Sequence, residues 1–344
     1  MNKQEQNKLL VKFAGGAAAQ VLALMNAIYL KERHKKEFSL KYFPYSTGTY
    51  WPFAIDFLVN GEEVFSLAGE TRGINSDADL EIGKIIRSHP LASKTFSYEK
   101  VLSIIRRLKL ERLLQKFRGE HAIEGSLKNL ERVTKKTKAI SGGFVPLLNT
   151  NVSKEMDSRF KLADKKSPFS KSHRSDESNF VVIHYRIGDK RAKFSIPSDF
   201  GGDGIVDPAS FRAILDSLNL ESALEIFVVS DEPRIAQKLL ATVQVNAKLN
   251  PKTGDIWEDI YLMSQAKVFI GSWSQVSQLA AVCNLSNGGR SFLPNTTQVG
   301  TKIRWQLKGV DFYKPAFLPS THSIYSPDFK LDENAHSSYK ASKN

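Results

Sequence analysis

The first half of the chain combines a short apolar run with long segments of helical periodicity. The run at 8–13 predicts a strand, Gly15 and Gly16 predict a tight turn, and the nearly continuous apolar residues at 17–29 predict a buried helix. From 80 to about 137, apolar residues recur every three or four positions between basic ones. This spacing is typical of amphipathic helices, so we expect a helix-rich N-terminal half.

The second half has a different texture, in which continuous apolar runs alternate with amphipathic segments. Runs rich in Val, Ile and Phe predict strands at 180–185, 224–229 and 268–270. Helices are predicted at 208–218, 234–240, 257–265 and 273–282. Continuous apolar strands that alternate with helices indicate a parallel sheet covered on both faces. We therefore predict a doubly wound α/β domain in this half.

A polar stretch separates the two halves. Residues 164–179 are rich in serine and lysine and lack periodicity, which predicts a linker or a mobile loop. The expected organisation is one domain over 1–175, a second over 176–325, and a disordered polar tail over 326–344. A length of 344 residues agrees with two domains of ordinary size.

Positive charge is concentrated in one part of the chain. Lys and Arg number 49 against 36 Asp and Glu, a net charge of +13, and residues 84–138 alone carry 15 basic and 5 acidic side chains. Such a surface favours phosphate-rich partners such as a nucleotide sugar, a membrane leaflet or a lipid-pyrophosphate acceptor. The alternative is a set of solvated helical faces. No nucleic-acid-binding motif accompanies the charge, so nucleic acid is not an expected partner.

Cysteine content and the most apolar segment favour a cytoplasmic protein. Cys283 is the single cysteine, which excludes an intrachain disulfide and a thiolate metal cluster, and we interpret it as a small core residue. The segment 14–30 contains Gln20 and Asn26, is short for a bilayer span, and precedes a basic run without a cleavage site. We expect a buried helix there, with at most peripheral contact at the inner face of a membrane.

The residues that follow the predicted strands are the candidates for chemistry. In an open parallel sheet the ligand crevice lies outside the carboxyl ends of the strands. Three strand ends carry unusual polar residues, namely 184–189 (His-Tyr-Arg-Ile-Gly-Asp), 230–233 (Ser-Asp-Glu-Pro) and 271–274 (Gly-Ser-Trp-Ser). Arg186, at the end of a buried strand, needs an anion, and small hydroxyl residues at the start of a helix form an anion site.

These motifs, in this order and followed through 259–276, resemble the fucosyltransferase superfamily of α1,6-, α1,2- and protein O-fucosyltransferases. The resemblance covers about 180–285 and, more weakly, the glycine-rich loop within 10–30. It implies two Rossmann-like domains of glycosyltransferase-B type, with the acceptor-side domain first and the GDP-sugar-binding domain second. It also implies inverting transfer of fucose from GDP-fucose to a glycan hydroxyl, with no metal and no other cofactor. The basic segment makes a lipid-linked glycan a further candidate acceptor.

The resemblance also implies roles for individual residues. Arg186 corresponds to the catalytic arginine that holds the β-phosphate of GDP, His184 and Asp259 to residues that read the guanine, and Ser274 to a phosphate-binding serine. The donor-binding residues implied as a set are His184, Gly188, Asp189, Asp231, Asp259, Ser272, Ser274, Gly15 and Gly16. Four residues have a plainer alternative: His184 as a core histidine, Arg186 and Asp189 as a structural ion pair, and Asp231 as a helix cap.

Three positions depart from the pattern of the family. Ile187 stands where many relatives have a second arginine, Ala19 replaces an asparagine of the glycine-rich loop, and 190–193 (Lys-Arg-Ala-Lys) lacks the glutamate that serves as the base in the α1,6 branch. The catalytic base is left unassigned, with Asp199 and Asp203 as poor candidates. A transferase of another nucleotide sugar and a non-catalytic, polyanion-binding protein of the same fold are the alternative functions.

One carboxylate pair has the spacing of a metal site. Asp77 and Asp79 are separated by one residue, as in metal-dependent glycosyltransferases, but they follow no predicted strand and precede a helical run. We interpret Asn75, Ser76 or Asp77 as a helix cap, and not the pair as metal ligands. Gly15 and Gly16 lack the spacing of a dinucleotide fingerprint, which disfavours a nicotinamide cofactor.

Overall fold

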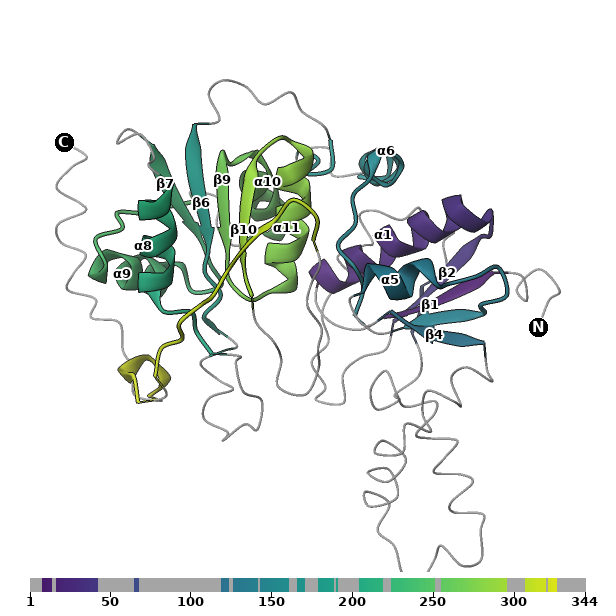
Figure 1. Cartoon of the computed structure of the whole chain (residues 1–344), viewed down its shortest axis with the longest axis horizontal. Coiled ribbons are helices and arrows are strands. Elements are labelled where there is room, and N and C mark those ends of the chain that lie inside the picture. Colours follow the sequence, from purple (N-terminus) through teal and green to yellow (C-terminus); the bar gives the residue numbers. More distant parts are fainter. Residues whose placement is uncertain are drawn as a thin grey trace, which may run out of the picture.

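The chain contains two parallel β-sheets flanked by helices (Figure 1). The computed structural model describes residues 8–13, 17–42, 65–67, 119–123, 126–141, 143–160, 166–170, 179–188, 190, 204–218, 224–250, 255–295, 307–319 and 321–326. The first sheet is built from strands before residue 142 and the second from strands after residue 179. The boundary predicted at 175/176 lies outside the described residues, as does the expected tail beyond Ser326.

The first sheet has five strands in the order β3-β2-β1-β5-β4. They are β1 (Leu9–Phe13), β2 (Phe38–Tyr42), β3 (Phe65–Leu67), β4 (Glu120–Ala122) and β5 (Ala139–Ser141), and every pairing is parallel. The helices of this unit are α1 (Ala17–His34), α5 (Leu127–Glu131) and α6 (Thr150–Arg159). Alternate residues of β1 are buried in a core with α1, which covers that face of the sheet.

The second sheet has six strands in the order β11-β10-β9-β6-β7-β8, again all parallel. They are β6 (Phe180–His184), β7 (Glu225–Val229), β8 (Lys248–Leu249), β9 (Val268–Gly271), β10 (Arg290–Pro294) and β11 (Asp311–Tyr313). The connecting helices are α8 (Pro208–Ser217), α9 (Pro233–Thr242), α10 (Ile256–Gln265) and α11 (Gln275–Ser286). Read from β8, this is the 3-2-1-4-5-6 strand order of a Rossmann sheet. Successive strands are added toward one side of the sheet from β6 to β8 and toward the other side from β9 to β11, so the topological switch point lies between β6 and β9.

Helices cover both faces of the second sheet. Alternate residues of β6 point to opposite sides: Val182 lies in a core with α10 and α11, whereas Val181 and Ile183 lie in a second core with α8 and α9. Strands buried on both faces show the continuous apolar runs from which they were predicted. The predicted α/β fold class, with two parallel Rossmann-like sheets and a doubly wound sheet in the C-terminal half, is confirmed.

Local capping explains where the helices of the second unit begin. Asp207, Asp255 and Ser274 each precede a helix and accept a hydrogen bond from a backbone N–H of its first turn. Pro208 and Pro233 occupy first-turn positions, where the missing N–H has no cost. The helix predicted at 273–282 therefore starts two residues later, after its Ser274 cap.

The two units share an apolar core. Residues of α1, α10 and α11 belong to one hydrophobic cluster, and α1 packs against α11 (Figure 1). Within the described ranges, no helix is both long and apolar enough to cross a bilayer. The expectation that 17–29 forms a buried helix is confirmed, although α1 continues to His34 and so includes part of the basic run.

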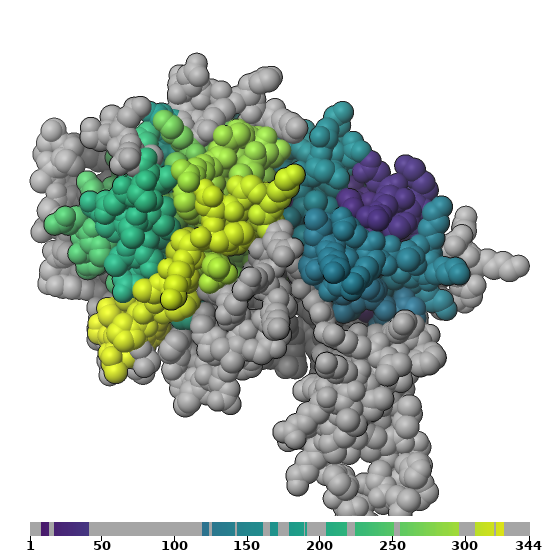
Figure 2. All heavy atoms as spheres, viewed as in Figure 1, coloured from purple at the N-terminus to yellow at the C-terminus, as the bar shows by residue number. Residues whose placement is uncertain are grey.

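The last described segment runs back across the second unit. Figure 2 shows residues 307–319 and 321–326, in yellow, crossing the surface over the green elements of this unit. Phe317 forms an antiparallel bridge with Val206, and the backbone N–H of Leu318 donates to the carbonyl of Ile205. The Oη of Tyr313 donates to the carbonyl of Gly271 at 2.9 Å, which ties this segment to the end of β9.

The expected helical character of 80–137 needs a correction. Residues 80–118 lie outside the described part of the chain, but Glu120–Ala122 form a short strand, β4, and Leu127–Glu131 form a five-residue helix, α5. The strand exists because β5 pairs with it, and because Lys12 Nζ donates to Glu120 Oε1 at 2.8 Å from β1. Long-range pairing of this kind leaves little trace in a three-residue window.

A buried asparagine pins the loop after β5 to α1. Asn26 is fully buried; its Nδ2 donates to the carbonyl of Val145 at 2.6 Å, and its Oδ1 accepts from the N–H of Val145 at 3.2 Å. The side chain therefore satisfies both backbone groups of one residue, as a neighbouring strand would. A leucine of similar size would leave both groups buried and unpaired.

We expect Asn26→Leu to lower the free energy of unfolding by about 2 kcal/mol, measured by urea denaturation. The matched control is Asn151→Leu, because Asn151 is exposed on α6 and bonds only to Glu32 at the surface. The control should change stability by less than about 0.5 kcal/mol. Equal changes in the free energy of unfolding in the two variants would show that the bonds between Asn26 and Val145 do not stabilise the fold as expected.

Candidate active site

The polar residues predicted to form the donor site lie at the topological switch point of the second sheet, between β6 and β9. β6 lies between β7 and β9, with His184 opposite Val229 of β7 and opposite Gly271 of β9. The three motifs that begin or end at these positions therefore meet at one edge of the sheet. Ligands of open α/β sheets bind in the crevice formed at such a switch point.

Ser272 connects the ends of β6 and β9 through both its backbone and its side chain. The N–H of Ser272 donates to the carbonyl of His184 at 2.9 Å, and the N–H of Arg186 donates to Ser272 Oγ at 2.9 Å. Ser272 is only 2% exposed. Its hydroxyl thus takes the place of the next backbone acceptor beyond the paired residues of β6 and β9, and it holds the backbone of Arg186 in position.

The guanidinium of Arg186 lies at the start of α11. Its Nη1 donates to Ser274 Oγ at 3.1 Å, and the same oxygen accepts from the N–H of Val276 as the cap of that helix. The N-terminus of a helix carries positive partial charge and donor N–H groups. A cationic side chain and a positive helix end at one place together favour an anion, and a diphosphate is well suited to both.

His184 is buried beneath this point. Its Nδ1 lies 2.6 Å from Ser277 Oγ, one turn along α11, and the side chain is 7% exposed. A Cβ at Gly271 would approach Ser277 Cβ to 2.7 Å, so glycine there allows α11 to pack this closely. Burial, assisted by the charge of Arg186 and opposed by that of Asp231, lowers the pKa of His184 to about 4. The imidazole is therefore neutral at physiological pH.

Asp231 connects the end of β7 to the end of β6. Its Oδ1 accepts from the N–H of Ile187 at 2.9 Å, and a Cβ added to Gly188 would lie 3.0 Å from its Oδ2. The alternative interpretation of Asp231 as the cap of α9 is wrong: Glu232 occupies the cap position, and no side chain caps that helix. The carboxylate instead bonds to the backbone directly after Arg186.

Asp259 lies in the first turn of α10, and sequence reasoning missed its partner. The side chain is buried, and its Oδ1 accepts from Asn250 Nδ2 at 2.8 Å. Asn250 follows the two-residue strand β8, which was not predicted, so nothing in the sequence marked it as a strand-end residue. Ser277 was missed as well, although its place three residues after Ser274 would have put it on the same face of a helix.

The remaining predicted site residues cannot be placed. Gly15, Gly16 and Asp189 lie outside the described residues, as do Asp199 and Asp203, the candidates for a base. The carboxylate pair at 77 and 79 lies outside them too. Within the described ranges, no group of three or more His, Cys, Asp and Glu side chains could hold a metal ion. Cys283 is fully buried in α11, which confirms its interpretation as a core residue.

Comparison with known proteins gives matches among solved structures alone. No family model and no curated protein matches the chain. The family 9 glycosyl transferase from Veillonella parvula is 8% identical with a TM-score of 0.38, covering 91% of this chain and 86% of that chain. The E. coli heptosyltransferase WaaC with ADP is 11% identical with a TM-score of 0.39, covering 89% and 93%.

A third similar structure is POFUT1 in complex with GDP-fucose. It is 12% identical with a TM-score of 0.36, covering 85% of this chain and 98% of that chain. Identities and TM-scores at this level do not define an activity, a donor or an acceptor. The function of this chain is therefore argued from its own site.

Proposed function

We propose that the protein is an inverting, metal-independent glycosyltransferase that moves fucose from GDP-fucose to the hydroxyl of a glycan or lipid-linked glycan. The observation that carries the proposal is the position of the Arg186 guanidinium, bonded to Ser274 at the start of α11, at the switch point of the sheet. The order of motifs that resembles fucosyltransferases favours GDP-fucose among nucleotide sugars.

In this proposal Arg186 is the main catalytic residue, because it stabilises the leaving β-phosphate. Breaking the bond between the sugar and the phosphate leaves negative charge on the β-phosphate of GDP. A guanidinium whose contact strengthens as that charge develops lowers the barrier, as do the N–H groups at the start of α11. Ser272 and Ser274 hold the arginine before the reaction begins, so little reorganisation is needed.

The guanine would be held by neutral and acidic groups. Asp259 offers carboxylate oxygens to the two adjacent N–H donors of guanine, and Asn250 orients that carboxylate by holding its Oδ1. His184 is neutral, and its Nδ1 is engaged with Ser277, which leaves Nε2 as the ring nitrogen for the nucleotide. The catalytic base that takes the proton from the acceptor hydroxyl is not assigned to any described residue.

A thermal-shift panel tests the donor. At pH 7.5 and without divalent metal, GDP and GDP-fucose are expected to raise the melting temperature more than UDP, ADP or CMP do, because only a ligand that prefers the folded state stabilises it. Asp259→Asn should reduce the preference for GDP, since an amide offers a donor where guanine needs an acceptor.

Four outcomes would overturn the assignment. Equal shifts with every nucleotide would remove the case for guanine, and a larger shift with UDP or ADP would favour a transferase of another nucleotide sugar. An absolute requirement for manganese would contradict metal-independent transfer. Stabilisation by GDP without any consumption of GDP-fucose, across a panel of glycan acceptors, would favour the non-catalytic alternative.

A further inference from the structure

The amino ends of three neighbouring strands of the first sheet bring lysines together. β1 lies between β2 and β5, so Lys8, Lys36 and Lys138, which precede or nearly precede these strands, share one edge. The N–H of Leu9 donates to the carbonyl of Glu37, and that of Leu10 donates to the carbonyl of Lys138. Lys36 Nζ also donates to the carbonyl of Thr137 at 2.9 Å. We call Lys8, Lys35, Lys36, Lys135, Lys136 and Lys138 the lysine edge.

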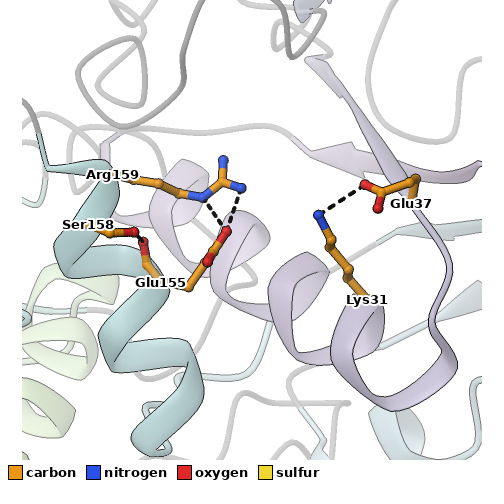
Figure 3. Close-up of polar contacts among 5 residues, drawn as sticks. All are labelled: Lys31, Glu37, Glu155, Ser158 and Arg159. Atoms are coloured by element: carbon orange, nitrogen blue, oxygen red, sulfur yellow. Dashed lines mark hydrogen bonds and ion pairs between the residues drawn. The ribbon is translucent and has the colours of Figure 1, made fainter.

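Nearby acidic groups do not neutralise this edge. Residue 8 with 31–37 and 128–138 carries ten basic and three acidic side chains. Glu37 pairs with Lys31 at 3.0 Å (Figure 3), and Glu32 bonds to Asn151 of α6. Among the described residues, none of the six lysines of the lysine edge forms an ion pair. Most of the positive charge therefore faces solvent.

Helix stability explains only part of this charge. Basic residues in the last turn of a helix offset its negative end, which accounts for Lys31 and Arg33 in α1. Lys135 and Lys136 lie in a turn between α5 and β5 and are exposed, so that explanation does not reach them. Lys8, before β1, is exposed as well.

The composition of the lysine edge indicates which anionic partner fits it. Lysine predominates among the basic side chains here, with Arg33 and Arg132 as the two arginines of these segments. The compact charge of a lysine attracts phosphate without the planar, bidentate geometry that arginine offers. Phe38, the aromatic residue of the adjoining strand end, is buried, so it offers no platform for stacked bases. A diffuse layer of phosphate charge is the better match.

We propose that the lysine edge docks on the surface of an anionic lipid bilayer. This proposal goes beyond the transferase activity, since it concerns the attachment of the protein to a membrane and not the sugar that it transfers. α1 runs from this edge to α11, and its 18 residues span roughly 27 Å. The crevice is thereby held away from the bilayer, within reach of a sugar on an extended lipid-linked chain.

The test compares two variants of equal net charge. Lys8→Glu/Lys135→Glu/Lys136→Glu reverses three exposed lysines of the edge, and Lys154→Glu/Lys308→Glu/Lys314→Glu reverses three exposed lysines elsewhere. Sedimentation is measured with phosphatidylcholine vesicles with and without phosphatidylglycerol. Each lysine near an anionic surface is worth about a fivefold factor in binding, so the edge variant should lose roughly 100-fold. The control variant should bind like the wild type, and binding should fade with added salt.

The outcomes separate this proposal from the enzymatic one. Absence of salt-sensitive binding by the wild type, equal losses in both variants, or full binding by the edge variant would each overturn the lysine edge. Tighter binding to single-stranded RNA than to vesicles, lost in the same variant, would replace lipid by nucleic acid. The GDP thermal shift should persist in both variants, and its absence from the wild type would count against the transferase alone.

Discussion

Replacing Arg186 with alanine is expected to lower the turnover of GDP-fucose by about 10²- to 10³-fold, the usual cost of one preorganised donor to a developing oxyanion. Because Ser274 and the backbone contact with Ser272 hold the arginine in place, its loss removes a charge already aimed at the leaving phosphate. Initial rates of GDP release with a glycan acceptor measure the effect.

Arg186→Lys should recover little of that activity. A lysine keeps the charge but cannot form two parallel hydrogen bonds to a phosphate, and it would not reproduce the Nη1 contact to Ser274. Arg212→Ala is the matched control, because Arg212 lies on the surface of α8 in an exposed pair with Asp216. It should leave turnover within about twofold of the wild type.

Folding must be measured in the same experiment. The guanidinium contributes to the contact between β6 and α11, so Arg186→Ala could also loosen the domain. Native far-UV dichroism and an unchanged urea midpoint identify a folded variant. A folded Arg186→Ala protein that turns over GDP-fucose within a few-fold of the wild type would show that the leaving-group assignment is wrong.

The elements that sequence predicted best are those buried on both faces. β6, β7 and β9 are continuous apolar runs, and the helices between them have clear amphipathic spacing, so most of their bounds were predicted within two or three residues. β8, β10 and β11 were not predicted. β8 has two residues and β11 has three at a sheet edge, where pairing with a neighbour and not local pattern makes the strand.

The candidate site was partly predictable for a topological reason. Parallel strands bring all their carboxyl ends to one edge, so residues after predicted strands can be expected to meet without knowledge of the strand order. That logic placed His184, Arg186, Asp231, Ser272 and Ser274 together. It could not supply individual bonds: a Ser-Asp-Glu-Pro sequence suits a helix cap, and only the adjacency of β6 and β7 gives Asp231 its bond to Ile187.

Asp231→Leu is expected to reduce turnover by about 100-fold, because a shift of the catalytic group by 1 Å can cost that much. In this prediction Asp231 is a positioning residue: its carboxylate holds the N–H of Ile187 and thereby the backbone of Arg186. The loss should fall mainly on kcat, with a smaller change in the KM for GDP-fucose. Asp216→Leu, an exposed carboxylate on α8, is the matched control and should leave both constants unchanged.

Two further variants distinguish positioning from direct contact with the donor. Asp231→Asn keeps an oxygen that accepts from Ile187, so it should retain turnover within about fivefold of the wild type. Gly188→Ala should lower kcat without touching the carboxylate itself, because the added methyl would meet Asp231 Oδ2 at 3.0 Å and displace it. If Asp231→Asn is as inactive as Asp231→Leu while both remain folded, the negative charge of Asp231 acts on the donor directly, and its role is not positioning.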